Sequence, residues 1–167
     1  MTARPLRAVF LAFLLSTVTA GPSNASFQSA VQAFDAGAYA TAAAQWRSLA
    51  VTCDLQAQTA LADLFRIGLG VPQSDVHALR WYLLAAWAGE RYAQQASGDA
   101  YARGEGVPAD SVRAAFWLTL AADQGLNWSA GRRDEIVSAL SQTARDLLED
   151  RLAAYRPTLP SKCRSGR

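Results

Sequence analysis

A pattern of 36 residues occurs twice in succession in this sequence, and it constrains the fold more than any other feature. The segment Gly-Leu-Gly-Val-Pro at residues 68–72 returns as Gly-Glu-Gly-Val-Pro at residues 104–108. Residues 57–92 and 93–128, laid over each other, agree at 15 of 36 positions. A period of this length is typical of stacked supersecondary units, in which each unit contacts only its neighbours.

Each unit predicts two helices joined by a short turn. Between Ala57 and Phe65 the apolar residues recur at every third or fourth position, which predicts an amphipathic helix. Gly68 suits the left-handed end of that helix. Ser74 suits the N-cap of the next helix, a place that Asp110 takes in the second unit. No alternating apolar pattern of useful length occurs, so an all-α fold without strands is expected.

The segments that flank the two units extend the predicted array. Residues 26–56 predict a degenerate N-terminal helical pair, because alanine and tryptophan recur there in the same frame. Residues 131–155 predict one long capping helix, because their apolar stripe leaves a polar outer face on which nothing stacks. Residues 156–167 are then a flexible basic tail. The chain is predicted to be a right-handed α-solenoid of seven helices.

The N-terminus carries the marks of a secretory signal peptide. Arg4 and Arg7 precede an apolar run of about a dozen residues that ends in small residues. The predicted signal is residues 1–20, with cleavage after Ala20 or after Ala25. An uncleaved anchor is the alternative, although no apolar run approaches the ~18 residues of a membrane-spanning helix. The mature chain is expected in the periplasm or outside the cell, without a transmembrane segment.

Removal of this signal leaves a neutral chain. The full sequence has 16 Lys+Arg against 14 Asp+Glu, and loss of the two N-terminal arginines leaves 14 against 14. Residues 21–150 hold nine arginines and all 14 acids, a net charge of −5, and residues 151–167 hold five basic residues, a net charge of +5. A neutral exported protein is not expected to bind nucleic acid. Its basic end is suited to an anionic surface or to the acidic body of the same chain.

The sequence offers little for catalysis or metal binding. His77 is the only histidine, so neither a zinc site nor a Ser-His-Asp triad is expected. The Gly-x-Gly pairs follow helices and lack a third glycine, which argues against nucleotide binding. Asp63 and Asp99 occupy equivalent positions and are expected to lie ~10 Å apart, each meeting an arginine of a neighbouring unit. No catalytic residue, cofactor or metal is predicted.

The combination of Gly-x-Gly-Val-Pro, a capping residue, Ala-x-x-Trp-Tyr, Ala-Ala and Gly resembles the Sel1-like repeat, a relative of the tetratricopeptide repeat. The resemblance covers the repeats at residues 57–92 and 93–128 closely and residues 27–56 loosely. It implies a scaffold or adaptor whose curved helical surface binds a protein or peptide ligand. A cysteine-rich branch of that family is linked to β-lactam binding and hydrolysis. That branch pairs cysteines within each repeat, and this chain lacks such pairs.

Two cysteines, Cys53 and Cys163, remain after export. An oxidising compartment favours a disulfide between them, which would join the C-terminal tail to the first third of the chain. Two separate thiols are the alternative. The sequence contains no Cys-x-x-Cys, so redox catalysis of the thioredoxin type is not suggested.

Positions at which the two repeats differ are the better candidates for binding. Trp87 replaces an aspartate of the second unit and shares a helical face with Arg80 and Arg91. Tyr92 and Trp128 occupy equivalent positions at the turn into the first helix of a unit. Because aromatic residues and arginine dominate binding hot spots, these five are the predicted partner-binding residues. The alternative for Trp87 is packing under the N-terminal helices or the tail.

The sequence therefore predicts an exported, non-enzymatic Sel1-type scaffold that binds a protein or peptide partner in the cell envelope. Two other functions stay open at this point. One is an envelope hydrolase related to the β-lactam-binding branch. The other is a structural module that docks on an anionic envelope polymer.

Overall fold

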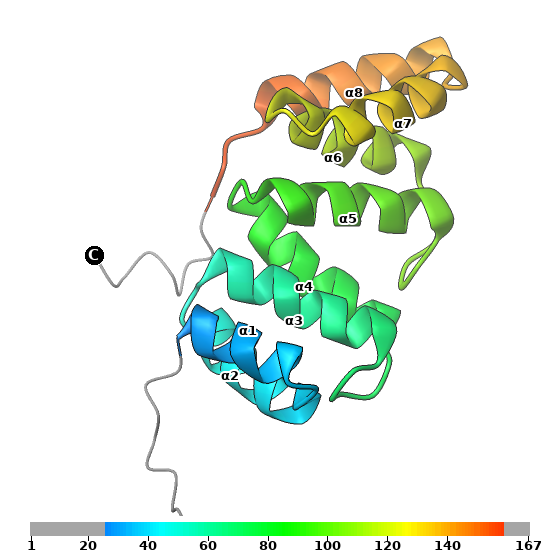
Figure 1. Ribbon diagram of the computed structural model, residues 1–167. Coiled ribbons are helices and arrows are strands. Elements are labelled where there is room, and N and C mark those ends of the chain that lie inside the picture. Colours follow the sequence, from blue (N-terminus) through cyan, green and yellow to red (C-terminus); the bar gives the residue numbers. More distant parts are fainter. Residues whose placement is uncertain (1–25, 159–167) are drawn as a thin grey trace, which may run out of the picture.

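The computed structural model describes residues 26–158, and over these residues every regular element is an α-helix (Figure 1). The predicted all-α class is confirmed. In chain order the helices are α1 (Phe27–Asp35), α2 (Tyr39–Val51), α3 (Leu55–Ile67), α4 (Asp75–Trp87), α5 (Arg91–Arg103), α6 (Ser111–Asp123), α7 (Asn127–Ser138) and α8 (Gln142–Ala154).

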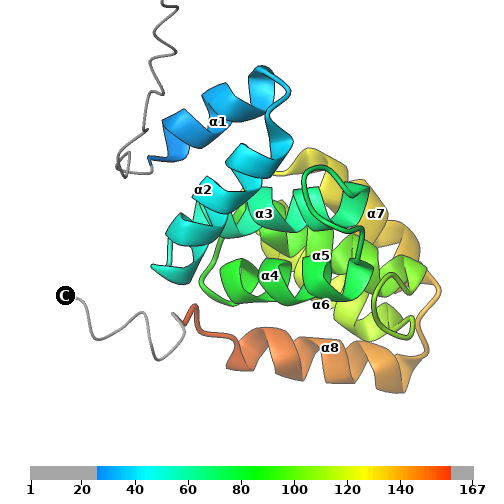
Figure 2. The same cartoon turned by 90° about the horizontal axis from the view of Figure 1, so that it is seen from below.

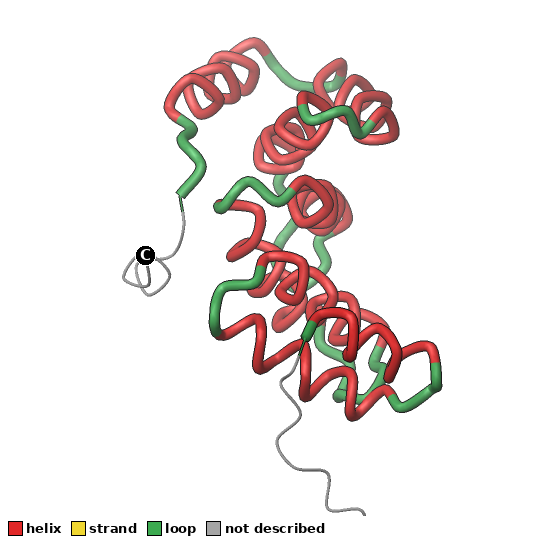
Figure 3. The backbone as a smooth tube through the Cα atoms, turned by 60° about the vertical axis from the view of Figure 1, so that its left-hand side comes forward, coloured by secondary structure: helices red, strands yellow, loops and turns green. Residues whose placement is uncertain are grey.

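From α1 to α7 each helix packs against the next one along the chain, which produces a stacked array (Figures 1 and 3). The array is the predicted α-solenoid. Its core is rich in fully buried alanines, for example Ala57, Ala85 and Ala121. These small side chains let helix axes approach closely, while large buried rings, among them Trp46, Tyr82 and Trp117, fill the remaining space. No helix within residues 26–158 is long and apolar enough to cross a membrane.

The turns inside the two central units follow the sequence predictions. Gly68 ends α3 with a φ of 76°, and Gly104 ends α5 with a φ of 74°, both in the left-handed region. Ser74 Oγ accepts a hydrogen bond from the His77 backbone N–H at 3.3 Å, and Asp110 Oδ1 accepts one from Arg113 at 2.9 Å. Both predicted N-caps are therefore confirmed.

The second glycine of each Gly-x-Gly pair makes a contact between units. A Cβ built on Gly106 would lie 2.8 Å from the backbone nitrogen of Val76 and closer still to the carbonyl of Asp75. A Cβ on Gly70 would lie 2.6 Å from the backbone nitrogen of Ala40. Each glycine thus touches the first turn of the second helix in the preceding unit. Glycine is required here because backbone meets backbone, and neither side can move out of the way as a flexible side chain would.

The C-terminal prediction is wrong in one respect. Residues 131–155 do not form a single capping helix, and the structure has eight helices in its described part where seven were expected. The helix is interrupted by a turn at residues 139–141. The N–H groups of Ala139 and Leu140 bond to carbonyls only three residues back, which ends α7. Ser141 Oγ then accepts from the Ala144 N–H at 3.3 Å and starts α8.

The break matters because it lets the last two helices pack in different places. Helix α7 packs on α6 as the next member of the array, whereas α8 turns back and also packs on α6 (Figure 2). Leu148 of α8 is 5% exposed in this contact, while Leu147 faces outward. A continuous helix could not bury both halves of the predicted apolar stripe against α6, so the turn at residues 139–141 is favoured.

Candidate functional site

The described part of the chain has several concave sites, and two of them are lined by predicted binding residues. The first, which we call the polar cleft, has a volume of about 360 Å³ and lies between α3, α4 and α5. Its charged lining residues are Asp63, Arg66, Asp75, Asp99, Arg103 and Glu105. The second, which we call the aromatic pocket, has a volume of about 580 Å³ and is lined by residues of α4, α5, α6, α8 and the segment after α8. The two sites share no lining residue.

One end of the polar cleft is built around the phenol of Tyr82. Its hydroxyl donates a hydrogen bond of 2.6 Å to Asp63 Oδ1, and Arg66 Nε donates to the phenol oxygen at 3.4 Å. Burial of the ring and the nearby Asp63 charge both raise the pKa of Tyr82 above its ordinary value. Arg66 also forms an ion pair with Asp63 at 3.5 Å. Tyr82 is thus held neutral as a donor and is unsuited to act as a base at neutral pH.

The other end of the polar cleft is held by Asp99. Its Oδ1 lies 3.7 Å from Arg103 Nη1 and 3.6 Å from Arg132 Nε of α7. Asp99 therefore meets an arginine of the next unit, as predicted. Asp63 does not, because its partners Arg66 and Tyr82 belong to its own unit. Arg103 also binds Glu105 at 2.6 Å, and this hydrogen bond lowers the pKa of the Glu105 carboxyl.

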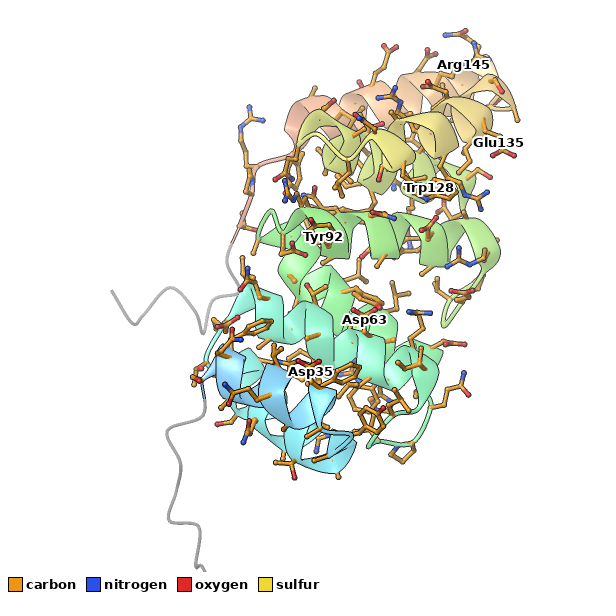
Figure 4. All side chains as sticks on the ribbon, in the orientation of Figure 1. Asp35, Asp63, Tyr92, Trp128, Glu135 and Arg145 are labelled. Carbon is orange, nitrogen blue, oxygen red and sulfur yellow. The ribbon has the colours of Figure 1, made fainter. Side chains whose placement is uncertain are left out.

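Two exposed aromatic rings lie on the side of the array that carries the polar cleft. Tyr92 lines the cleft and is 52% exposed, and Trp128 is 72% exposed. Figure 4 shows both on the face formed by the first helices of the units, with Asp63 below them and Glu135 above. The guanidinium of Arg91 lies 4.9 Å from the centre of the Tyr92 ring, close enough for a cation–π contact. The phenol is therefore held in place at the rim and still presents a free edge.

The aromatic pocket is organised by Trp87 at the end of α4. Its ring lies 4.8 Å from that of Trp117 and 6.0 Å from that of Phe116, both on α6. Tyr155, which follows α8, lies 5.9 Å from it on another side. The chain beyond α8 is tied to the same place, because the Thr158 N–H donates to the Trp87 carbonyl at 2.7 Å. The ring is nevertheless 44% exposed.

The predicted binding residues thus fall into separate groups. Trp87 lies in the aromatic pocket, whereas Arg91 lies over Tyr92 at the polar cleft. Arg80 is exposed on α4 and lines neither site. Arg91 does not share a site with Trp87, because the turn at Gly89 redirects the chain before Arg91. The alternative of packing under the C-terminal segment describes Trp87 better.

Several residues of the two sites were missed at the sequence level. Arg113 and Phe116 of the aromatic pocket both lie on α6, and the return of α8 onto α6 brings Tyr155 to them from a segment that is distant in sequence. The predicted disulfide partner Cys163 and the predicted signal peptide lie outside the described residues. Cys53 is partly buried in the turn between α2 and α3 and has a φ of 75°.

His77 and the carboxylates are the side chains to consider for metal binding or acid–base chemistry. Within residues 26–158 no group of three His, Cys, Asp or Glu side chains is placed to hold a metal ion. His77 shares a hydrogen bond of 2.8 Å with Ser74 Oγ and stacks on Phe65, with ring centres 5.3 Å apart. Its position at the start of α4 therefore has a structural explanation. Three of the four carboxylates that line the polar cleft, those of Asp63, Asp99 and Glu105, are paired with arginine.

Comparison with known proteins agrees with this geometry. The family model of the Sel1 repeat matches residues 55–89 and 91–126. No curated protein matches the sequence. Among solved structures, a protective antigen present in uropathogenic Escherichia coli strains, which displays an SLR fold, is similar with a TM-score of 0.74 at 23% identity. That similarity covers 83% of this chain and 31% of the antigen.

A Sel1 repeat protein from Oxalobacter formigenes is similar with a TM-score of 0.64, also at 23% identity, over 78% of this chain and 56% of that one. The chain therefore spans less than two thirds of either relative. At this identity the similar structures show the fold alone. The family model identifies the two repeats. The two central helix pairs, α3 with α4 and α5 with α6, are therefore Sel1 repeats.

Proposed function

We propose that this protein is an exported, non-enzymatic scaffold that binds a peptide segment of a protein partner in the cell envelope. Sel1 repeat proteins typically serve as scaffolds for protein interactions. The proposed binding face runs over α3, α5 and α7 and includes the polar cleft, Tyr92 and Trp128.

The observation that carries the proposal is the repetition of an exposed aromatic ring. Tyr92 and Trp128 are 36 residues apart, so they occupy the same position in successive units, and both are more than half exposed. Large exposed rings on a curved repeat surface are typical anchors for a peptide. A ligand that touched both rings would lie across the first helices of the units.

The polar cleft beside Tyr92 supports a peptide as the ligand. An extended peptide presents backbone N–H donors and C=O acceptors along its length. The cleft offers both kinds of partner, carboxylates at Asp63 and Glu105 and guanidinium groups at Arg66 and Arg103, with side chains that are roughly a third to a half exposed. The aromatic rings would take apolar side chains, and the cleft would take the backbone.

Export is proposed from the N-terminal sequence alone, since residues 1–20 lie outside the described part of the chain. N-terminal sequencing of the protein purified from the envelope fraction tests it. A mature chain that begins at Gly21 or at Ser26 would support export with cleavage. A chain that retains residues 1–20 in the cytoplasmic fraction would overturn it.

The binding proposal is tested by crosslinking in intact cells. A photoreactive residue placed at Gln95, which lines the polar cleft, is expected to form a discrete adduct with a protein partner, identified by mass spectrometry. The same residue placed at Glu149, exposed on α8, should not form it. A synthetic peptide covering the crosslinked segment is then titrated against the purified mature chain by calorimetry.

Variants of the two rings decide whether this face is used. Tyr92→Ala combined with Trp128→Ala is expected to weaken peptide binding at least tenfold, while Leu147→Ala, an exposed apolar residue of α8, leaves it unchanged. Equal binding by both variants would place the partner elsewhere. Assays with nitrocefin and with muropeptides test the non-enzymatic part of the proposal, and turnover that is lost with Asp63→Asn or Asp99→Asn would contradict it.

A further inference from the structure

We propose that the aromatic pocket binds a small ligand made of a planar apolar ring system with a carboxylate or sulfonate group attached. The inference does not rest on the proposed peptide face, because the aromatic pocket and the polar cleft have no lining residue in common. The pocket's size, its rings and its charge each point to this class of ligand.

The rings of the aromatic pocket form a floor and two walls. Phe116 and Trp117 are 5% and 2% exposed and form the floor, with their ring planes at 70° to each other. Trp87 stands at 78° to Trp117 on one side, and Tyr155 stands at 79° to Phe116 on another. These three pairs have the edge-to-face arrangement that aromatic side chains favour, while the contacts of Trp87 with Phe116 and Tyr155 are tilted. A flat ring that entered would meet both edges and faces of fixed aromatic groups.

Trp87 is partly exposed, and its packing against the neighbouring rings does not explain why. The ring is 44% exposed although it touches three other aromatic side chains. Its carbonyl is held by Thr158 and its neighbour Leu83 also lines the pocket. When a ligand covers apolar surface that is open to water inside a concave site, the burial of that surface favours binding.

The charge around the pocket is of one sign. Three arginines line it, Arg113 on α6, Arg151 on α8 and Arg156 after α8, and no acidic residue is among the described lining residues. Arg113 is held by Asp110 at 3.3 Å and lies over the Tyr101 ring at 5.4 Å. Arg156 Nη1 donates to the Tyr155 carbonyl at 2.6 Å, which leaves its other guanidinium nitrogens for a ligand. Guanidinium groups at an apolar rim favour a planar anion.

The size of the pocket suits a molecule of two or three rings. Its volume of about 580 Å³ lies within the usual range for small-ligand sites. The rigid position of the four rings means that little ordering is required when such a ligand binds.

The test uses a matched pair of probes. Anilinonaphthalene sulfonate has the proposed chemistry, and phenylnaphthylamine has the same ring system without the sulfonate. Binding to the purified mature chain is followed by probe fluorescence and by calorimetry, which gives the stoichiometry. We expect one saturable site for the sulfonate probe and at least tenfold weaker binding of the neutral probe.

Variants separate the rings from the charges. Arg151→Gln combined with Arg156→Gln is expected to weaken the sulfonate probe at least fivefold and to leave the neutral probe unchanged. Trp87→Ala is expected to weaken both probes about tenfold. Trp128→Ala removes an exposed tryptophan from the other site and is the control, with no change for either probe. Circular dichroism and thermal unfolding must show each variant folded.

Equal affinity for the two probes, or an unchanged sulfonate affinity in the double arginine variant, would overturn the proposal. The arginine variants keep the test decisive even if Trp87→Ala unfolds the chain. Because Tyr92→Ala and Trp128→Ala are predicted to leave probe binding intact, failure here and failure of the peptide proposal are distinguishable.

Discussion

The side-chain amide of Gln94 donates a hydrogen bond of 3.2 Å to the carbonyl oxygen of Ala86, across the boundary between one repeat and the next. One period earlier, Gln58 donates to Ala50 at 3.0 Å. Both glutamines are buried, at 1% and 0% exposure. A buried polar side chain that reaches the last turn of the preceding helix sets the register between units, because it is satisfied in only one position.

Gln94→Met is expected to lower the free energy of unfolding by ~1–3 kcal/mol, the usual cost of losing buried hydrogen bonds. Gln94 also accepts from Gln124 Nε2 at 2.7 Å and donates to the Tyr155 hydroxyl at 3.2 Å, so these groups lose a partner as well. Urea unfolding followed by circular dichroism measures the change. Gln56→Met, at an exposed position of α3, is the control. Equal stabilities of the two variants would show that the glutamine does not hold the interface.

Gly106→Ala is expected to be more destabilising than Gly125→Ala. Both glycines have a left-handed backbone, with φ of 72° and 89°, so each alanine is strained by ~1–2 kcal/mol. A Cβ at Gly125 has open space, whereas a Cβ at Gly106 meets the backbone of Asp75 and Val76. Overpacking adds roughly 1–3 kcal/mol at Gly106. Thermal unfolding of the two variants gives the order, and a reversed or equal order would contradict the contact between units.

Tyr82→Phe is predicted to have an effect on stability that shrinks as the pH rises. The folded-state pKa of Tyr82 is raised, so its contribution to stability is complete below the unfolded pKa of about 10 and is lost progressively above it. Phenylalanine does not titrate. The difference in unfolding free energy between wild type and variant should therefore be larger at pH ~8 than at pH ~11. A difference that stays constant over this range would mean that Tyr82 ionises normally.

A disulfide between Cys53 and Cys163 stays a prediction, and one structural observation adds to it. Cys53 has a φ of 75°, and the positions one and two periods later are Gly89 and Gly125, with φ of 94° and 89°. A side chain is uncommon in this conformation, so a cysteine here needs a reason beyond the turn. Non-reducing peptide mapping of the protein purified from the envelope fraction, where we propose it lies, is expected to find the crosslinked pair.

Reduction of that disulfide is expected to lower the unfolding free energy by ~4–5 kcal/mol in the chain-entropy model, because the closed loop is long. Cys163→Ser should reproduce the effect and make the protein insensitive to dithiothreitol. If both thiols of the purified envelope protein react with an alkylating reagent before reduction, the predicted link is wrong.

The local elements of this protein were predictable from sequence because their causes are local. The caps at Ser74 and Asp110 and the left-handed ends at Gly68 and Gly104 each depend on a few consecutive residues. The 36-residue period was equally visible, and it implied stacking because one helix pair cannot bury its apolar face alone. The all-α solenoid follows from these two facts.

The place at which the chain folds back on itself was not predictable from sequence. The apolar stripe from residue 136 to residue 148 fits one long helix or two short ones equally well, and the packing surface of α6 selected two. That choice placed Tyr155 against Trp87 and Phe116 and so created the aromatic pocket. Helical periodicity predicts which residues are buried. It does not predict which distant surface of the chain covers them, because several surfaces compete for that contact. The repeats are thus encoded in local sequence, whereas the sites between them depend on contacts between segments that are distant in sequence.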